Sequence, residues 1–236
     1  MQNEERFASV DYENKGELVY TQLAHALMQG KLLPGERLKI RELADRMGTS
    51  VTPVRDAILR LVQDGALVML SARDIRVREL SLDEYLEIRR IRVELEGIAA
   101  SQAAQHATPD NVTQLRDMLA THERAVRANL RDEAIAANQN FHFALCHIGK
   151  LPQLAEILRR LWLKVGPLIA QCYPEAGRDI IDHHYPAVDA IARGDELAAK
   201  VAMQTDIVLG GQSMLEALME GRSVKAGGTT LLHKKL

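Results

Sequence analysis

Apolar residues in the stretch 40–63 recur with the spacing of two short helices separated at Gly48. Glycine can adopt the backbone angles of a tight turn. After it, Thr52 can cap the second helix, and Pro53 suits the first helical position, where an amide hydrogen has no partner. Two such helices joined by a turn predict a helix-turn-helix. The apolar residues that repeat at i, i+3, i+4 and i+7 are Ile40, Leu43, Ala44 and Met47, then Val54, Ala57, Ile58, Leu61 and Val62.

The polar residues of the second helix lie together on its other side. Short polar and arginine side chains near a helix N-terminus suit phosphates and base edges. The pattern therefore favours DNA binding, while an ordinary helical hairpin of an all-α protein is the alternative that this stretch leaves open. The residues predicted to point outward are Thr52, Arg55, Asp56, Arg60 and Gln63.

Two short β-prone runs follow the helix-turn-helix, at Leu67–Leu70 and Ile75–Val77. A two-stranded ribbon in this place is a wing, with Arg73, Arg76 and Arg78 on or near it. The run 37–40 can pair with the wing as a short edge strand.

The segment LMQGKLLPGERLKIRELADRMGTSVTPVRDAILRLVQDGALV resembles the DNA-binding domain of GntR-family transcriptional regulators. The matching segments are L-x-P-G-E-x-L, E-L-A, T-P-V-R-x-A and D-G-x-L-V, in this order. The resemblance implies a winged helix-turn-helix over residues 1–78. It also implies DNA contacts by Arg41 and Arg55 and a phosphate contact by Thr52, to which the outward-facing Arg60 and the wing residue Arg73 are added.

Two positions of this domain depart from the family pattern. Val51 stands where family members commonly place an arginine that reads guanine, and an apolar side chain cannot make that bidentate contact. The wing tip carries Arg73 and Asp74 where the family usually has glycine. We therefore expect an operator that differs from the usual family half-site.

The distribution of charge supports this division of the chain. The net charge of the chain is −2, but residues 31–78 contain 10 Lys and Arg against 6 Asp and Glu. Residues 79–220 contain 14 against 21, so the positive excess lies where phosphate would be neutralised. Two cysteines make no disulfide framework, and long apolar runs are lacking. We expect a cytoplasmic protein without a membrane span.

From Leu82 onward, every amphipathic pattern is helical. The expected fold is mainly α: the winged helix-turn-helix, then an antiparallel bundle of about six helices over residues 79–220. Residues 1–14 are expected to form a mobile arm and residues 221–236 a flexible tail. A first helix ends at Gly30, and the helices of the bundle are expected at 82–106, 108–129, 131–148, from Pro152, from Pro174 to about 194, and at 195–220.

Four segments of the bundle resemble the FCD sensor domain of the FadR-like branch: EIRRIRVELEGIAASQAA, NQNFHFAL, DHHYPAVDAIARGDELAA and AMQTDI. The resemblance implies a divalent metal inside the bundle that helps to hold a small organic acid. Its ligands fall on Asn138, His142, His184 and Asp206. Asn138 and His142 are four residues apart and so share a helix face, and the other two come from different helices.

Two imidazoles and a carboxylate suit Zn, Ni or Mn ions. Asn138 replaces the family's aspartate and gives up its charge for a weak amide oxygen. Asp206 replaces a histidine, which partly restores that charge with a shorter and harder ligand. A metal-free cavity lined by His142 and His184 is the alternative. Cys146, four residues after His142, offers another ligand set, although a buried apolar cysteine is the more common case.

Arg92 and Arg89 on the opening helix of the bundle are the predicted effector contacts. Arg92 lies in the R-x-x-L-E segment, and an arginine can hold a carboxylate bidentately. The alternative for Arg92 is a structural ion pair with Glu94, Glu96 or a neighbouring helix.

Together these features predict a transcriptional regulator, usually a repressor in such families, and not an enzyme. A homodimer would place two recognition helices in successive major grooves of a palindromic double-stranded DNA operator. A small carboxylate in the bundle would modulate DNA binding. The alternatives are an effector-blind architectural DNA-binding protein and a metal-dependent enzyme in which His142, His184 and Asp206 activate water, for which no general base has motif support.

Overall fold

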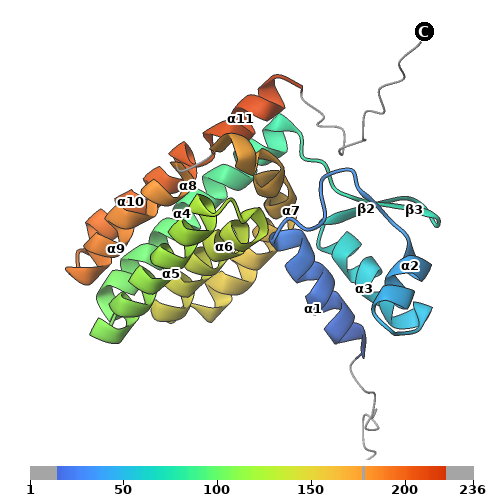
Figure 1. Ribbon diagram of the computed structural model, residues 1–236, viewed down its shortest axis with the longest axis horizontal. Coiled ribbons are helices and arrows are strands. Elements are labelled where there is room, and N and C mark those ends of the chain that lie inside the picture. The colour runs from blue at the N-terminus through green and yellow to red at the C-terminus, as the bar shows by residue number, and fades with distance from the viewer. Residues whose placement is uncertain (1–14, 177–178, 222–236) are drawn as a thin grey trace, which may run out of the picture.

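The computed structural model describes residues 15–176 and 179–221 of the chain. The predicted arm (residues 1–14) and nearly all of the predicted tail (residues 222–236) lie outside the described residues. Figure 1 shows a small head that contains the first three helices and the strands, beside an elongated bundle of helices.

The head contains three helices and a small antiparallel sheet. The helices are α1 (Lys15–Met28), α2 (Ile40–Arg46) and α3 (Val51–Gln63), and the strands are β1 (Arg37–Leu38), β2 (Leu67–Ser71) and β3 (Asp74–Val77). The strand order is β1-β3-β2, with Leu38 opposite Ile75 and Leu67 opposite Val77. The predicted wing is therefore confirmed. Its pairing with an edge strand is confirmed for Arg37 and Leu38, whereas Ile40, the end of the predicted run, already begins α2.

The helix-turn-helix has the predicted turn but a different helix start. Gly48 has a positive φ of 61°, as a tight turn requires. Thr52 does not cap α3, because the helix begins at Val51, two residues earlier than predicted, with Ser50 in the capping position and no side-chain cap bond. Pro53 is accordingly the third helical residue, which costs no hydrogen bond in a first turn. The residues predicted to point outward from α3 are all exposed.

Between residue 82 and residue 221, the described part of the chain forms eight helices, five of 14 to 25 residues and three of four to nine residues. The starts of the first two are fixed by capping boxes, Ser81 with Glu84 and Thr108 with Asn111. The predicted bundle is therefore confirmed. Its helices are α4 (Leu82–His106), α5 (Pro109–Arg127), α6 (Arg131–Ile148), α7 (Pro152–Ala176), α8 (Asp179–Asp182), α9 (His184–Ala192), α10 (Glu196–Leu209) and α11 (Gln212–Met219).

Pro174 does not start a helix, contrary to the prediction, because α7 continues through it to Ala176. A proline has no amide hydrogen for the carbonyl four residues before it, which here belongs to Ala170. The guanidinium of Arg131 donates a hydrogen bond to that carbonyl. A side chain from α6 thus satisfies the group that the proline leaves free.

The predicted last helix, residues 195–220, is divided into α10 and α11 at Gly210 and Gly211. The Tyr85 hydroxyl on α4 donates to the Gly211 carbonyl at 2.8 Å. A Cβ at position 211 would lie 2.6 Å from that hydroxyl oxygen. The break therefore allows a close contact between the end of α10 and the first turn of α4.

The head contacts the bundle through backbone packed against backbone. In Figure 1, α1 runs up to α7. A Cβ at Gly30, which follows α1 and has a φ of 65°, would lie 1.9 Å from the Ala170 Cβ on α7. A Cβ at Gly166 would lie 2.8 Å from the Met28 backbone. The close approach of head and bundle depends on these two glycines.

Candidate functional site

The predicted DNA-binding residues Arg41, Arg55 and Arg73 line one groove of the head. The groove has a volume of about 610 Å³ and runs between β1, α2, the start of α3 and the wing tip, with Val51 in its wall. Thr52 is exposed in the first turn of α3. The structure therefore gathers four of the predicted positions at the N-terminal end of α3, on α2 and on the wing.

Two further cations, Arg37 and Lys39, line the same groove and were missed in the sequence. The Arg37 guanidinium donates to the Arg73 carbonyl at 2.6 Å, which ties β1 to the wing tip. Glu42 is the acidic residue in the groove wall, and it pairs with Lys39 at 2.6 Å. The alternation of cations at 37 and 39 was the available signal, because alternate residues of an extended segment share a face.

Arg60 lies apart from this groove, at the contact between α3 and α1. Its guanidinium pairs with Glu17 and lies 3.8 Å from the ring centroid of Tyr20. The Tyr20 hydroxyl in turn donates to Asp64 at 2.8 Å. Arg60 thus fastens α1 to the recognition helix, and a DNA contact by this residue stays a prediction.

The four predicted metal ligands come together inside the bundle. Asn138 and His142 lie on α6, His184 is the first residue of α9, and Asp206 lies on α10; all are buried. The ligand atoms of His142, His184 and Asp206 lie within 4.8 Å of one another. His184 Nε2 is 3.3 Å from one Asp206 oxygen, and His142 Nε2 is 3.7 Å from the other.

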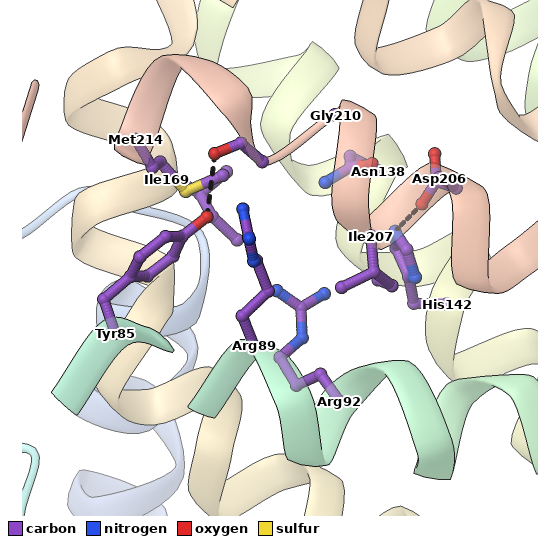
Figure 2. A pocket seen from close by; sticks show the side chains of 11 residues that line it. Tyr85, Arg89, Arg92, Asn138, His142, Ile169, Asp206, Ile207, Gly210 and Met214 are labelled. Atoms are coloured by element: carbon purple, nitrogen blue, oxygen red, sulfur yellow. Dashed lines mark hydrogen bonds and ion pairs between the residues drawn. The ribbon is translucent and has the colours of Figure 1, made fainter. Parts of the chain in front are cut away.

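These distances fit a metal ion. Two ligand atoms of a tetrahedral Zn site, each about 2.1 Å from the ion, lie about 3.4 Å apart. Both ring nitrogens of His184 and the Oδ1 atom of Asn138 are buried without a hydrogen bond. Buried polar atoms of this kind ordinarily have a partner. The buried group of His142, His184 and Asp206 could therefore hold a metal ion, with the Asn138 oxygen facing the same pocket (Figure 2).

Burial shifts the pKa values of two of the site's residues, Asp206 and His184. Burial, with a smaller contribution from the Glu96 carboxylate, raises the pKa of Asp206 to about 7 against the opposing effects of His142 and Arg92. Burial also lowers the pKa of His184 well below its usual value, as do the neighbouring His142 and His122. A bound cation favours the ionised carboxylate and the neutral imidazole, which are the forms that bind metal.

The alternative ligand Cys146 is a buried thiol that resembles a core residue. It is 1% exposed, and burial raises the pKa of its thiol to about 12. Among the described residues, the group with metal-ligand geometry contains no cysteine.

Arg92 and Arg89 both point from α4 into the pocket, but they differ in the contacts of their guanidinium groups (Figure 2). Arg92 is buried, donates from Nε to Glu96 at 2.6 Å and lies 4.6 Å from the Trp162 ring centroid. The ion pair with Glu96, one of the two alternatives for this residue, is thus present. The Nη1 atom of Arg89 is buried without a hydrogen bond.

Two residues of the site, Tyr85 and His122, were missed in the sequence, and a third, Glu96, was named only as an alternative ion-pair partner of Arg92. Tyr85 lines the pocket beside Arg89. His122 on α5 is buried, with its ring centroid 5.8 Å from that of His184, and burial lowers its pKa to about 4.

A carboxylate oxygen of Glu96 lies 2.5 Å from His142 Nδ1. Burial would raise the pKa of Glu96, yet Arg92 and His142 outweigh it and hold that pKa at about 2. The i,i+4 spacing of Arg92 and Glu96 was the one signal for this group.

The pocket between these residues is small. Its cavity has a volume of about 30 Å³. That volume holds on the order of one water molecule. Its walls also contain Ile169, Ile207 and Met214, beside the α10–α11 break at Gly210 (Figure 2).

Comparison with known proteins agrees with both parts of the structure. Residues 15–77 match the family described as bacterial regulatory proteins, gntR family, and residues 87–208 match the FCD domain. The chain belongs to the GntR family of transcriptional regulators, in the FadR-like branch with a C-terminal FCD domain. Members of this family are DNA-binding regulators and not enzymes. In the part of the chain that the structure describes, none of the helices has both the length and the apolar character to cross a membrane.

Two relatives and one solved structure illustrate the similarity. The chain is 34% identical over 182 residues to the HTH-type transcriptional regulator McbR of Escherichia coli, covering 75% of this chain and 82% of McbR. The solved structure of E. coli McbR/YncC has a TM-score of 0.79 at 29% identity and covers 89% of this chain and 99% of that one. A probable D-xylose utilization operon transcriptional repressor from Paenarthrobacter nicotinovorans is 29% identical and covers 75% of this chain and 78% of its own.

Proposed function

We propose that the protein is an effector-responsive repressor that binds a palindromic operator as a homodimer and responds to a small organic acid. The observation that carries this proposal is a pocket, in a DNA-binding regulator, that is lined by His142 and Asp206 of the buried His–His–Asp group and by Arg89, whose Nη1 atom has no hydrogen bond. The relative described as a probable D-xylose utilization operon transcriptional repressor supports repression rather than activation. Such a regulator acts in the cytoplasm, on chromosomal DNA.

The groove of the head is the proposed DNA interface. Arg55 and Arg41 contact base edges or phosphates, Thr52 contacts a phosphate at the start of α3, and Arg73 follows the backbone from the wing. The described cations of the groove wall exceed its acids, which favours phosphate. Val51 lies in the wall of this groove, so we infer that the operator differs from that of relatives with arginine in its place.

We expect Arg55→Ala to weaken binding to the promoter DNA next to the protein's own gene by about 10- to 100-fold. One bidentate arginine contact contributes about 1–3 kcal/mol. Fluorescence anisotropy with labelled promoter fragments at fixed salt measures the affinity. Arg116→Ala, on the exposed face of α5, removes the same charge outside the groove and should bind like the parent. Equal affinity of the Arg55 variant and the parent would remove Arg55 from the interface.

A second copy of the chain is the proposed partner of the bundle. Exposed apolar side chains gather on α4 and α10, which pack against each other: Ile91, Ile98, Leu197, Val201 and Val208. Apolar residues that are grouped on one face ordinarily mark an interaction site. A dimer formed here would place two heads on two operator half-sites.

The proposed metal is a divalent ion of the Zn, Ni or Mn type. His142, His184 and Asp206 are its ligands, and the Asn138 amide oxygen is a weaker fourth. The metal supplies a positive charge and open positions for effector oxygens. The protein residues fix the ligand atoms and exclude bulk water.

Arg89 is the proposed contact for the effector carboxylate. Its Nη1 atom has no partner, whereas Arg92 already pairs with Glu96. Because the cavity has room for only about one water, an effector must be small and must displace lining side chains such as Met214. The α10–α11 break next to the pocket is the element that can move.

We expect Arg89→Met to raise the Kd for small carboxylates by about 10- to 100-fold, because a hydrogen bond to a charged group contributes about 1.5–3 kcal/mol. The measurement is thermal unfolding of metal-loaded protein against a panel of two- to six-carbon mono- and dicarboxylates. Arg90→Met, at the exposed neighbouring position, is the matched control. If the parent itself responds to no member of the panel, the protein is effector-blind toward small acids and this part of the proposal fails.

A further inference from the structure

A line of buried polar contacts leads from the wall of the bundle into the metal site. Arg92 donates to one oxygen of Glu96 at 2.6 Å, and the other oxygen of Glu96 lies 2.5 Å from His142 Nδ1. On the far side of the ring, His142 Nε2 faces Asp206 at 3.7 Å. Glu96 and His142 are 1% and 3% exposed, so water does not substitute for these contacts.

The two nitrogens of His142 therefore have different surroundings. A neutral imidazole donates through one nitrogen and offers a lone pair from the other. With a carboxylate at Nδ1, the proton belongs on Nδ1, and the Nε2 lone pair is directed toward Asp206 and His184. A carboxylate behind a ligating histidine also orients the ring and strengthens it as a ligand.

We propose that Glu96 is the positioning residue of the metal site, which holds His142 with its Nε2 lone pair directed at the ion. Arg92 holds Glu96 in turn. This inference rests on the proposed metal function and deepens it. It separates the two arginines of α4: Arg92 acts on the metal through Glu96 and His142, and Arg89 acts on the effector anion.

A purely structural ion pair between Arg92 and Glu96 is the competing explanation. In that case, a change at Glu96 lowers the stability of the bundle but leaves the metal affinity and the ligand geometry of the folded protein unchanged. Metal affinity and the spectrum of a bound ion therefore distinguish the two explanations, because stability alone responds to both.

The experiment uses Co²⁺ as the probe, with the full-length parent, Glu96→Gln and Glu94→Gln. The side chain of Glu94 is exposed on the same helix, which makes it the matched control. We expect Glu96→Gln to bind Co²⁺ about 10- to 100-fold more weakly in competition with a chelator, as for other residues behind metal ligands. We also expect changed visible absorption bands, while Glu94→Gln matches the parent. Glu96→Asp keeps the charge on a shorter side chain, so its Co²⁺ affinity should lie between those of the parent and Glu96→Gln.

The dependence on His142 is tested in a double-mutant cycle. In a His142→Ala background, Glu96→Gln should cause no further loss of Co²⁺ affinity, because its effect passes through the missing ring. An equal loss in both backgrounds, or Glu96→Gln protein with parental affinity and spectrum, overturns the proposal. A parent that binds neither Co²⁺ nor Zn²⁺ removes the metal site as well as the role of Glu96, and leaves the Arg55 prediction for DNA intact.

Discussion

Replacing Gly30 by alanine is expected to lower the free energy of unfolding by about 3 kcal/mol. The positive φ of 65° costs an alanine about 1 kcal/mol, and its Cβ would lie 1.9 Å from the Ala170 Cβ, a distance at which one backbone must shift. Overpacking of this kind costs about 1–3 kcal/mol. Because Ala170 belongs to α7, the shift also loosens the head from the bundle.

Gly48→Ala is the matched control for this prediction. Gly48 has nearly the same φ, 61°, but nothing lies within 4 Å of its added Cβ, so only the conformational cost of about 1 kcal/mol remains. Urea unfolding followed by circular dichroism and by the fluorescence of Trp162, the single tryptophan, measures both variants. Equal losses for the two alanines would show that α1 and α7 accommodate a methyl group at their contact.

Asp206→Asn is expected to make the metal-free protein more stable at high pH while it abolishes tight metal binding. The pKa of Asp206 is raised from 3.8 to about 7 by burial. The stability associated with its protonated form is therefore fully present below pH 3.8 and is lost as the pH rises through 7. This loss is on the order of 4 kcal/mol. Asparagine is neutral throughout and avoids it.

The gain from Asp206→Asn, measured by urea unfolding in the presence of a chelator, should be about 3 kcal/mol larger at pH 8 than at pH 5. Asp189→Asn, at an exposed position of α9, should leave the pH dependence unchanged. Added Zn²⁺ should stabilise the parent and not the Asp206 variant. Identical pH dependence of parent and Asp206→Asn would mean that the carboxylate is already neutralised by a neighbour.

The cost of burying the ionised Asp206 carboxylate connects metal binding to the stability of the bundle. A buried carboxylate without a cation destabilises the folded state, and a bound ion removes that cost. The α10 helix that carries Asp206 ends at the break beside the pocket. In the proposed function, metal binding therefore acts on the helix whose end borders the proposed effector pocket.

Several features of the fold follow from local sequence. The helix-turn-helix, the wing and most of the bundle helices were predictable, because amphipathic spacing and capping residues act over a few positions. Ser81 and Thr108 fix helix starts through bonds to residues three positions later. The same reasoning failed at Pro174 and at the Gly210–Gly211 break. There, Arg131 and Tyr85 donate hydrogen bonds to the carbonyls of Ala170 and Gly211, which lie 39 and 126 residues away along the chain.

The residues of the candidate site also divide into those that the sequence predicted and those that only the packing of the helices brought together. Residue types, spacing and family resemblance were sufficient to select His142, His184 and Asp206, which the fold brings within ligand distance. Only the tertiary structure decided that Glu96 lies behind His142, that Arg92 is paired while an atom of Arg89 is not, and that Gly30 touches Ala170. Local spacing determines which face of a helix is buried, but the partner on the facing helix depends on how the helices pack, and no single segment encodes that.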